Sequence, residues 1–378
     1  MKIGIVCYPT YGGSGVMATE LGKALADKGH HVHFISSSLP VRLDTLGSNL
    51  YFHEVTMMNY PLFEYPPYET ALISKLVDVI KYEKLDILHV HYAIPHAFAA
   101  YVARQILAGE NIRIPVVTTL HGTDITLVGR DSTYEPAVTF SINNSDAVTA
   151  VSEYLREETF RHFEIKKEIR VIPNFVDFER FSKKSKEHFK IAIAPFGEKI
   201  IVHTSNFRPV KRIEDVVEIF ARIRKVMPAK LLLVGDGPER SRIEMMCRQL
   251  DICSDVRFLG KIEAVEEVLS IADLFLLPSE KESFGLSALE AMACQVPVIS
   301  SNTEGIPEVN INGATGFLSD VGDVEDMAKN ALYILSTPEI HHQFKTAAYE
   351  RASQFGLDKI MHLYEDLYLE LLRPVEVE

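Results

Sequence analysis

Two glutamates eight residues apart, Glu282 and Glu290, are the residues in this chain best spaced to hold one ligand together. The segment between them contains Gly285 and leads from an apolar run, 273–278, into a helical pattern, 286–294. Glycine lets the backbone approach a ligand closely, and the free N–H groups at a helix start attract an anion. Because the carboxylates would repel that anion, we expect them to accept hydrogen bonds from hydroxyl groups on either side of a phosphate.

The length of this segment indicates what kind of ligand it could hold. Eight helical residues span about 12 Å, which suits a sugar, a diphosphate and a ribose laid along the helix start. A solvated acidic helix with one face in the core is the alternative interpretation. The Phe284-Gly285 insertion between strand and helix is poor helix design without a ligand, so the pattern favours a nucleotide-sugar site.

A second glycine-rich loop, Gly-Gly-Ser-Gly at 12–15, follows the first apolar run and opens the first helical pattern. It is either a loop for a phosphate or carboxylate or a tight strand-to-helix turn, and this segment alone does not separate the two. It is not a dinucleotide fingerprint, because its spacing differs from G-x-G-x-x-G and the second strand-like run, ending at 35–39, offers no acidic residue.

Three cations, Arg208, Lys211 and Arg212, follow the first apolar run of the second half of an otherwise acidic chain. Cations are disfavoured at a helix N-terminus by the helix dipole. Their presence before the helix expected at 213–226 therefore favours an anionic ligand such as a diphosphate. An exposed basic start to that helix is the alternative.

Two further turns could form the walls of a pocket for a base. One contains Gly235 and Gly237 after a strand-like run, and the other ends at Lys261. Such turns can present backbone groups to a base edge, although either could also be simple punctuation between elements.

Histidines follow two strand-like runs of the first half. His121 follows 116–120, while His89, His91 and His96 lie in and after 87–91. A lone histidine is more often structural than catalytic, but His121 stands at a strand end beside a glycine, which favours a function. The other histidines lack carboxylates at metal-ligand spacing, so we predict no zinc site. No D-x-D occurs in the chain, so cations and a helix dipole must meet the charge of a leaving diphosphate.

The order of these elements indicates the fold class. Strand-like runs alternate with helical patterns, and the alternation restarts after residue 195. This predicts an α/β fold with mostly parallel, doubly wound sheets, whose strand ends carry the motifs on both sides of a cleft. We expect strands at 3–7, 32–35, 87–91, 116–120 and 147–151, and then at 200–204, 230–234, 256–259, 274–277 and 296–299.

Length and composition indicate the number of domains, the kinds of partner and the cellular location to expect. A chain of 378 residues suits two domains. A net charge of −13 argues against nucleic-acid partners and a polybasic membrane anchor. No apolar run approaches a membrane span, and the N-terminus resembles a strand more than a signal peptide. Four scattered cysteines predict a reducing, cytoplasmic location.

Taken together, these motifs resemble the retaining glycosyltransferases of family 4, which have the GT-B fold of two Rossmann-like domains facing across a cleft. Segment 282–290 carries the general family motif. Segments 7–22, 89–96, 118–126 and 205–212 are similar to the members that transfer GlcNAc from UDP-GlcNAc to the hydroxyl of L-malate, the first step of bacillithiol biosynthesis.

The resemblance implies a division of labour between the two halves. Residues 1–170 with the C-terminal helix 355–378 would bind the acceptor, and residues 171–354 would bind the nucleotide sugar. It also implies a metal-independent enzyme without a cofactor, acting as a homodimer or a larger homo-oligomer on UDP-GlcNAc and a small anionic acceptor.

Roles can be carried over by position. Glu290 would hold the ribose, Glu282 the hydroxyls of the donor sugar, and Lys211 the charge of the distal phosphate, with His121 near the reacting carbon. Family members often have an arginine where this chain has Asn206, and we expect Arg208 to supply the missing charge. The other donor-binding residues expected are Gly13, Asn206, Gly235, Gly237, Lys261, Ser283, Phe284, Gly285 and Leu286. The acceptor-binding residues expected are Ser14, Tyr92, Thr119 and Thr123.

The expected mechanism follows from which groups are available. A double displacement needs a carboxylate nucleophile, and no acidic residue of the first-half motifs has an obvious claim, although Asp124 stays a candidate. We therefore expect front-face attack in which the departing phosphate takes the acceptor proton.

Other interpretations remain open at this stage. They are a family 4 enzyme with another small acceptor, a UDP-GlcNAc epimerase with the GT-B fold, a non-enzymatic nucleotide-sugar binder, and an NAD-dependent oxidoreductase. The last is weakened by the missing dinucleotide fingerprint.

Overall fold

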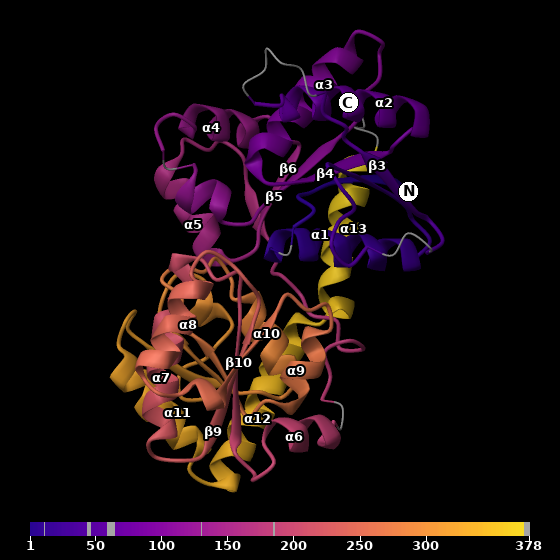
Figure 1. The fold of residues 1–378 in the computed structure, drawn as a ribbon. Helices are drawn as coiled ribbons and strands as arrows, with labels where there is room; N and C mark the ends of the chain where they lie inside the picture. Colours follow the sequence, from indigo (N-terminus) through magenta and orange to yellow (C-terminus); the bar gives the residue numbers. More distant parts are fainter. Residues whose placement is uncertain (11, 44–46, 59–64, 130, 184–185, 374–378) are drawn as a thin grey trace. The chain divides into compact units, whose positions relative to one another are not determined.

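The computed structural model describes residues 1–10, 12–43, 47–58, 65–129, 131–183 and 186–373 (Figure 1). The chain divides into two compact units, Met1–Pro173 with Ile360–Glu378, and Asn174–Lys359. Each unit is built on one sheet in which all neighbouring strands run parallel. This is the α/β class expected from the alternation of strand and helix patterns.

The first unit contains a seven-stranded sheet in the order β3-β2-β1-β4-β5-β6-β7. Its strands are β1 (Lys2–Val6), β2 (His31–Ser36), β3 (Leu50–Glu54), β4 (Ile87–His91), β5 (Val116–Leu120), β6 (Ala147–Ala150) and β7 (Ile169–Val171). Its helices are α1 (Gly13–Asp27), α2 (Tyr68–Glu83), α3 (Phe98–Ala108), α4 (Glu135–Asn143) and α5 (Glu153–His162). Single π-type turns, Ala93–Ala97 and Thr123–Leu127, follow β4 and β5.

The second unit contains a six-stranded sheet in the order β10-β9-β8-β11-β12-β13. Its strands are β8 (Lys199–Thr204), β9 (Ala229–Val234), β10 (Val256–Gly260), β11 (Leu274–Leu277), β12 (Val298–Ser301) and β13 (Gly316–Ser319). Its helices are α6 (Glu187–Ile193), α7 (Ile213–Arg224), α8 (Arg240–Gln249), α9 (Val265–Ile271), α10 (Leu286–Ala293), α11 (Val324–Leu335) and α12 (Pro338–Ala352), and α13 (Leu357–Leu372) begins here.

Both sheets reverse their strand order at one place, between β1 and β4 in the first and between β8 and β11 in the second. This is the Rossmann arrangement, in which the loops that leave the two strands at the reversal diverge and open a crevice for a ligand. The motifs singled out in the sequence follow these strands and their neighbours. The topology therefore places them where open α/β sheets bind ligands.

The core of the second unit shows why the sequence folds in this way. Helix α7 carries buried apolar residues at helical spacing, including Ile213, Val217 and Phe220. They belong to one buried cluster with Leu231 and Leu233 of strand β9. Burying each large apolar side chain contributes about 1.5–3 kcal/mol, so the helix is fixed mainly by this face.

Three strands were not predicted. Strand β3 lies at the edge of its sheet, and its residues are only partly buried. Strand β7 has three residues, and β13 is an edge strand of four. Short or half-exposed strands lack the continuous apolar run that identifies a buried parallel strand. The strand expected at 296–299 begins two residues later, at Val298.

No helix within the described residues combines the length and the apolar composition needed to cross a bilayer.

Helix α13 returns the chain to the first unit and buries Tyr364, Leu367 and Tyr368. The hydroxyl of Tyr368 lies 2.6 Å from Nδ1 of His89 in strand β4, where both side chains are fully buried. At the surface, Arg170 donates two hydrogen bonds to the Glu370 carboxylate, at 2.7 and 2.8 Å. Exposed ion pairs contribute little, so the buried pair is the stronger attachment.

We expect Tyr368→Phe to destabilise the protein by about 1–3 kcal/mol, because it leaves a buried nitrogen of His89 without its partner. Chemical unfolding followed by circular dichroism measures this change. The control is Leu369→Ala on the same helix, where the side chain is 49% exposed and the expected loss is within about 0.5 kcal/mol. Equal losses of unfolding free energy in the two variants would contradict the assignment of the Tyr368–His89 contact as the stronger attachment of α13.

Candidate active site

The two glutamates of the sequence motif lie on either side of the start of α10. Gly285 is the residue before the helix and has φ 94° and ψ 43°, a left-handed conformation that glycine adopts without strain. Glu282 lies in the loop before it, and Glu290 lies within the helix and is 8% exposed. The left-handed residue turns the loop into the helix, so the first amides of α10 are left free of intrahelical partners.

Lys211 and Glu282 form an ion pair, with Nζ and Oε2 2.5 Å apart. The loops that carry them are also joined by their backbones, because the Glu280 amide donates to the Val210 carbonyl at 2.9 Å. The Glu282 amide in turn donates to the Glu304 carboxylate at 2.7 Å. A cation and a carboxylate from two loops are thus held together at the start of α10.

Gly305 packs against the backbone of the loop that carries Glu282 and Ser283. It was not singled out in the sequence. Its amide donates to the Glu282 carbonyl at 3.0 Å. A Cβ at this position would lie 2.1 Å from the Ser283 carbonyl oxygen, so only glycine fits without a shift of the backbone. A glycine directly after Glu304, following an apolar run, is the signal that could have found it.

The three cations of the second half have different partners. Arg212 is paired with Asp215 at 2.6 Å, and Lys211 is paired with Glu282. Arg208 is exposed and has no ion pair among the described residues. Asn206, on the same loop, is exposed as well. Of the three cations, Arg208 is therefore the one whose charge is not already balanced within the protein.

Gly235 and Gly237 have a packing role that the sequence did not reveal. A Cβ on Gly235 would lie 1.8 Å from the Ser205 carbonyl oxygen, and one on Gly237 would lie 2.0 Å from that of Asn206. Their amides are also used internally, by the Gly260 carbonyl at 2.8 Å and by the Asp236 carboxylate at 2.9 Å. These two amides already have partners within the protein, so other backbone groups of the turn would have to contact a base edge, and that role stays a prediction. Lys261, in the adjacent turn, is exposed.

In the first unit, the first turn of α1 contacts the residue that follows β4. The Tyr92 hydroxyl donates to Ser14 Oγ at 2.7 Å, and Gly13 beside it is exposed. A Cβ on Gly15 would lie 2.6 Å from the Tyr8 carbonyl oxygen, so this glycine permits a tight strand-to-helix turn. Tyr11 of the same loop lies outside the described residues. The turn and the binding interpretations are therefore compatible, with Gly15 serving the turn.

His121 and His91 form a stacked, hydrogen-bonded pair at the ends of β5 and β4. His121 Nε2 lies 2.8 Å from His91 Nδ1, and the ring of Tyr92 lies 5.3 Å from that of His121. Burial lowers the pKa of His121 to about 3 and that of His91 well below its usual value. Both imidazoles are therefore neutral at physiological pH, and His121 can exchange hydrogen bonds but adds no positive charge.

Asp124 holds the loops after β4 and β5 together. Its Oδ2 accepts from the Ala93 amide at 2.9 Å, and its Oδ1 accepts from the amides of Gly122 at 3.1 Å and His121 at 3.4 Å. The side chain is 3% exposed, and burial raises its pKa to about 6. A carboxylate occupied by three amides is a clamp for the His121 loop, and this role was missed in the sequence.

The two candidate threonines lie in different surroundings. Thr119 is fully buried, and its hydroxyl contacts His89 Nε2 at 2.6 Å and Thr149 Oγ1 at 2.7 Å. Its side chain therefore belongs to the interior of the sheet, which corrects the expectation that it faces an acceptor. Thr123 is exposed in the turn after β5.

Comparisons with known proteins agree with this architecture. The family model "Glycosyltransferase Family 4" matches residues 11–180, and "Glycosyl transferases group 1" matches residues 184–351. Among solved structures, sucrose-phosphate synthase from Thermosynechococcus elongatus is similar with a TM-score of 0.82, 23% identity and coverage of 98% of this chain and 99% of that one. An Anabaena protein solved with UDP and glucose is similar with a TM-score of 0.81, 19% identity and coverage of 97% and 99%.

Two Rossmann-like units with these neighbours define the GT-B fold, and the chain belongs to the glycosyltransferases of family 4. The N-acetyl-α-D-glucosaminyl L-malate synthase of Bacillus anthracis is 50% identical over 378 residues, which is 99% of this chain and 98% of that protein. The protein is therefore a glycosyltransferase of this type.

The buried histidines of the first unit predict that acid destabilises the protein. Burial lowers the pKa of His89 and His121 to about 3 and that of His96 to about 4. Below about pH 6.5 the unfolded chain takes up protons that the folded chain does not. Their contribution to stability is thus present above pH 6.5 and is lost as the pH falls towards 4. Asp124 acts in the opposite sense, since its contribution is lost as the pH rises through about 6.

We therefore expect the midpoint temperature of thermal unfolding to decrease as the pH is lowered from 7 to 4.5 at constant ionic strength. His342→Gln, at an exposed position of α12, serves as a control and should keep the same profile. A midpoint that stays constant over this range would contradict the assignment of neutral buried imidazoles.

Proposed function

We propose that this enzyme transfers GlcNAc from UDP-GlcNAc to the hydroxyl of L-malate, with retention at the anomeric carbon. The observation that carries the choice of donor and acceptor is 50% identity, over 99% of the chain, with the Bacillus anthracis enzyme named for that product. The ion pair of Lys211 and Glu282 at the start of α10 supports a diphosphate donor independently of that name.

In this proposal the second unit binds the donor. The diphosphate lies at the start of α10, beside Phe284, Gly285 and Leu286 and next to Ser283 in the preceding loop, where the helix dipole favours negative charge. Lys211 contacts the distal phosphate without leaving Glu282, because an ammonium group has three N–H donors. Glu282 then accepts hydrogen bonds from hydroxyls of the sugar, and Glu290, one turn into the helix, from those of the ribose.

The first unit binds the acceptor in this proposal. Ser14 in the first turn of α1 and Thr123 in the turn after β5 offer hydroxyl groups, and Tyr92 holds the hydroxyl of Ser14 by a hydrogen bond. Gly13 lets the donor approach the start of α1. His121 lies beside the donor sugar as a neutral hydrogen-bonding group, held in place by His91 and by the Asp124 clamp.

The reaction then needs no protein nucleophile. The malate hydroxyl oxygen forms the new bond to the anomeric carbon on the face from which the diphosphate leaves, and the bond from that carbon to the phosphate oxygen breaks. The leaving phosphate oxygen takes the malate proton. Because the new bond forms on the face from which the diphosphate leaves, the configuration at the anomeric carbon is retained. Three amides already occupy Asp124, so it is a poor nucleophile for a double displacement. Positioning and the charge of Lys211 and Arg208 would supply the catalysis.

The cellular setting is part of the same proposal. The described chain includes all four cysteines, and each is a free thiol, as is usual in a reducing cytoplasm. A homodimeric state stays a prediction from the resemblance.

We expect UDP and a GlcNAc–malate glycoside to form from UDP-GlcNAc and L-malate, with the α-anomer identified by NMR. Omitting malate separates the alternatives, because an epimerase would still release UDP or a sugar isomer, and other small acids test a different acceptor. A chelator should leave the rate unchanged. Lys211→Ala should lower kcat/KM by about 10²–10³-fold, whereas the exposed control Lys225→Ala should not.

Arg208 is expected to supply the charge that the family places at Asn206. We predict that Arg208→Ala weakens UDP binding by about tenfold, which is about 1.4 kcal/mol, because a cation without an internal partner is lost from the phosphate loop. Isothermal calorimetry measures this, with the exposed Arg248→Ala as control. Unchanged UDP affinity in Arg208→Ala would show that Arg208 does not replace the arginine that family members often have where this chain has Asn206.

A further inference from the structure

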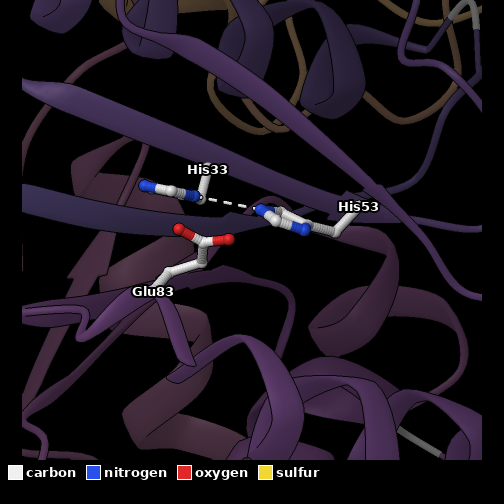
Figure 2. A group of neighbouring side chains, drawn as sticks. All are labelled: His33, His53 and Glu83. Carbon is white, nitrogen blue, oxygen red and sulfur yellow. Dashed lines mark hydrogen bonds between the residues drawn. The ribbon is translucent and has the colours of Figure 1, made fainter. Parts of the chain in front are cut away.

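Three potential metal ligands, His33, His53 and Glu83, lie together at the edge of the first sheet (Figure 2). His33 belongs to β2, His53 to the edge strand β3, and Glu83 is the last residue of α2. One ligand atom from each lies within 4.8 Å of the others, and His33 Nδ1 is 3.0 Å from His53 Nε2. The structure thus gathers two imidazoles and one carboxylate from three elements.

The strand register explains why the histidines meet. His33 pairs with Tyr51, and His53 pairs with Ile35, so the two histidines lie on one face of the sheet at diagonal positions of neighbouring strands. Glu83 is held nearby because its backbone carbonyl accepts a hydrogen bond from Lys2 Nζ at 2.8 Å. The residues are 20 to 50 positions apart in the chain, so no local metal-ligand spacing marks them in the sequence.

The ionisation states match those of a metal site. Burial lowers the pKa of His33 to about 4 and also lowers the pKa of His53, although the nearby Glu83 carboxylate acts on His53 in the opposite direction as a smaller cause. Both rings are therefore neutral, the form that binds metals. The Glu83 carboxylate has no ion pair or hydrogen bond among the described residues. A neutral histidine pair leaves that negative charge unbalanced, whereas a divalent cation would balance it.

We propose that His33, His53 and Glu83 bind one divalent transition-metal ion, of which Zn²⁺ is the representative. In a tetrahedral zinc site with bonds of about 2.0–2.1 Å, two ligand nitrogens are roughly 3.3 Å apart. The histidine nitrogens are already at 3.0 Å, so they would separate by a few tenths of an ångström, and Glu83 would close in by side-chain rotation. Two nitrogen donors favour Zn²⁺ over Mg²⁺ or Ca²⁺.

The position of the cluster gives this ion a structural role. The candidate active-site residues of the first unit follow the carboxyl ends of β1, β4 and β5, whereas Glu83 ends the helix that leads into the amino end of β4. The ion would tie the edge strand β3, whose neighbour among the described strands is β2, to α2. It is separate from the transfer reaction, so it is compatible with catalysis that does not depend on a metal.

The test uses the full chain after chelator treatment, titrated with ZnCl2 alone. We expect one ion to bind in calorimetry and to raise the thermal midpoint, and Co²⁺ in its place to give the absorption bands of a low-coordinate site. His53→Ala and Glu83→Gln should each weaken binding by at least roughly tenfold. His31→Ala, at an exposed position of β2, the strand that carries His33, is the matched control and should bind as the unchanged chain does.

The quantity compared is the rise in midpoint caused by the metal, so a variant that is merely less stable does not imitate the result. Circular dichroism of each variant without metal establishes that it is folded. No binding by the unchanged chain, or equal binding by His53→Ala, would reject the site and leave a plain histidine–histidine hydrogen bond. Because no readout is activity, failure here is distinct from failure of the proposed transfer reaction.

Discussion

The arrangement of the second unit depends on one constraint, which is that a cation and a carboxylate from two loops are held together at the start of α10. Lys211 follows β8 and Glu282 follows β11, and these strands are neighbours only because the strand order reverses between them. The backbone bond from Glu280 to Val210 fixes the same pair of loops. The topology therefore decides which charges meet, and the helix start then decides which sign of ligand they can serve.

The fold could be predicted where burial leaves a strong sequence signal. Strands β4 and β5, which are buried at every position, were predicted with the bounds that they have. The edge strand β3 was missed because half of a parallel edge faces water and carries polar residues. Strand β7 was missed because three residues form no pattern. The reversal of strand order, by contrast, follows from long-range pairing that no local segment encodes.

The site was predictable in its positions and less so in its contacts. Sequence patterns placed Lys211 and His121 after strands and Gly285 at a helix start, where the structure has them. They could not show whether a glycine allows close approach of a ligand or of another backbone segment. Gly237 allows close approach of the backbone of Asn206. Nor could they show that Thr119 points into the sheet, since both faces of a central strand are buried.

The two units also differ in how they use charge. At the strand ends of the second unit, Lys211, Arg208 and Glu282 are ionisable groups that remain partly or fully exposed, so they can respond to a charged diphosphate. At the strand ends of the first unit, burial keeps His91 and His121 neutral, and amides occupy the buried carboxylate of Asp124. A transfer reaction with an anionic leaving group needs strong charge only where that group departs. The neutral imidazoles of the first unit can exchange hydrogen bonds without adding charge, which is compatible with the proposed chemistry.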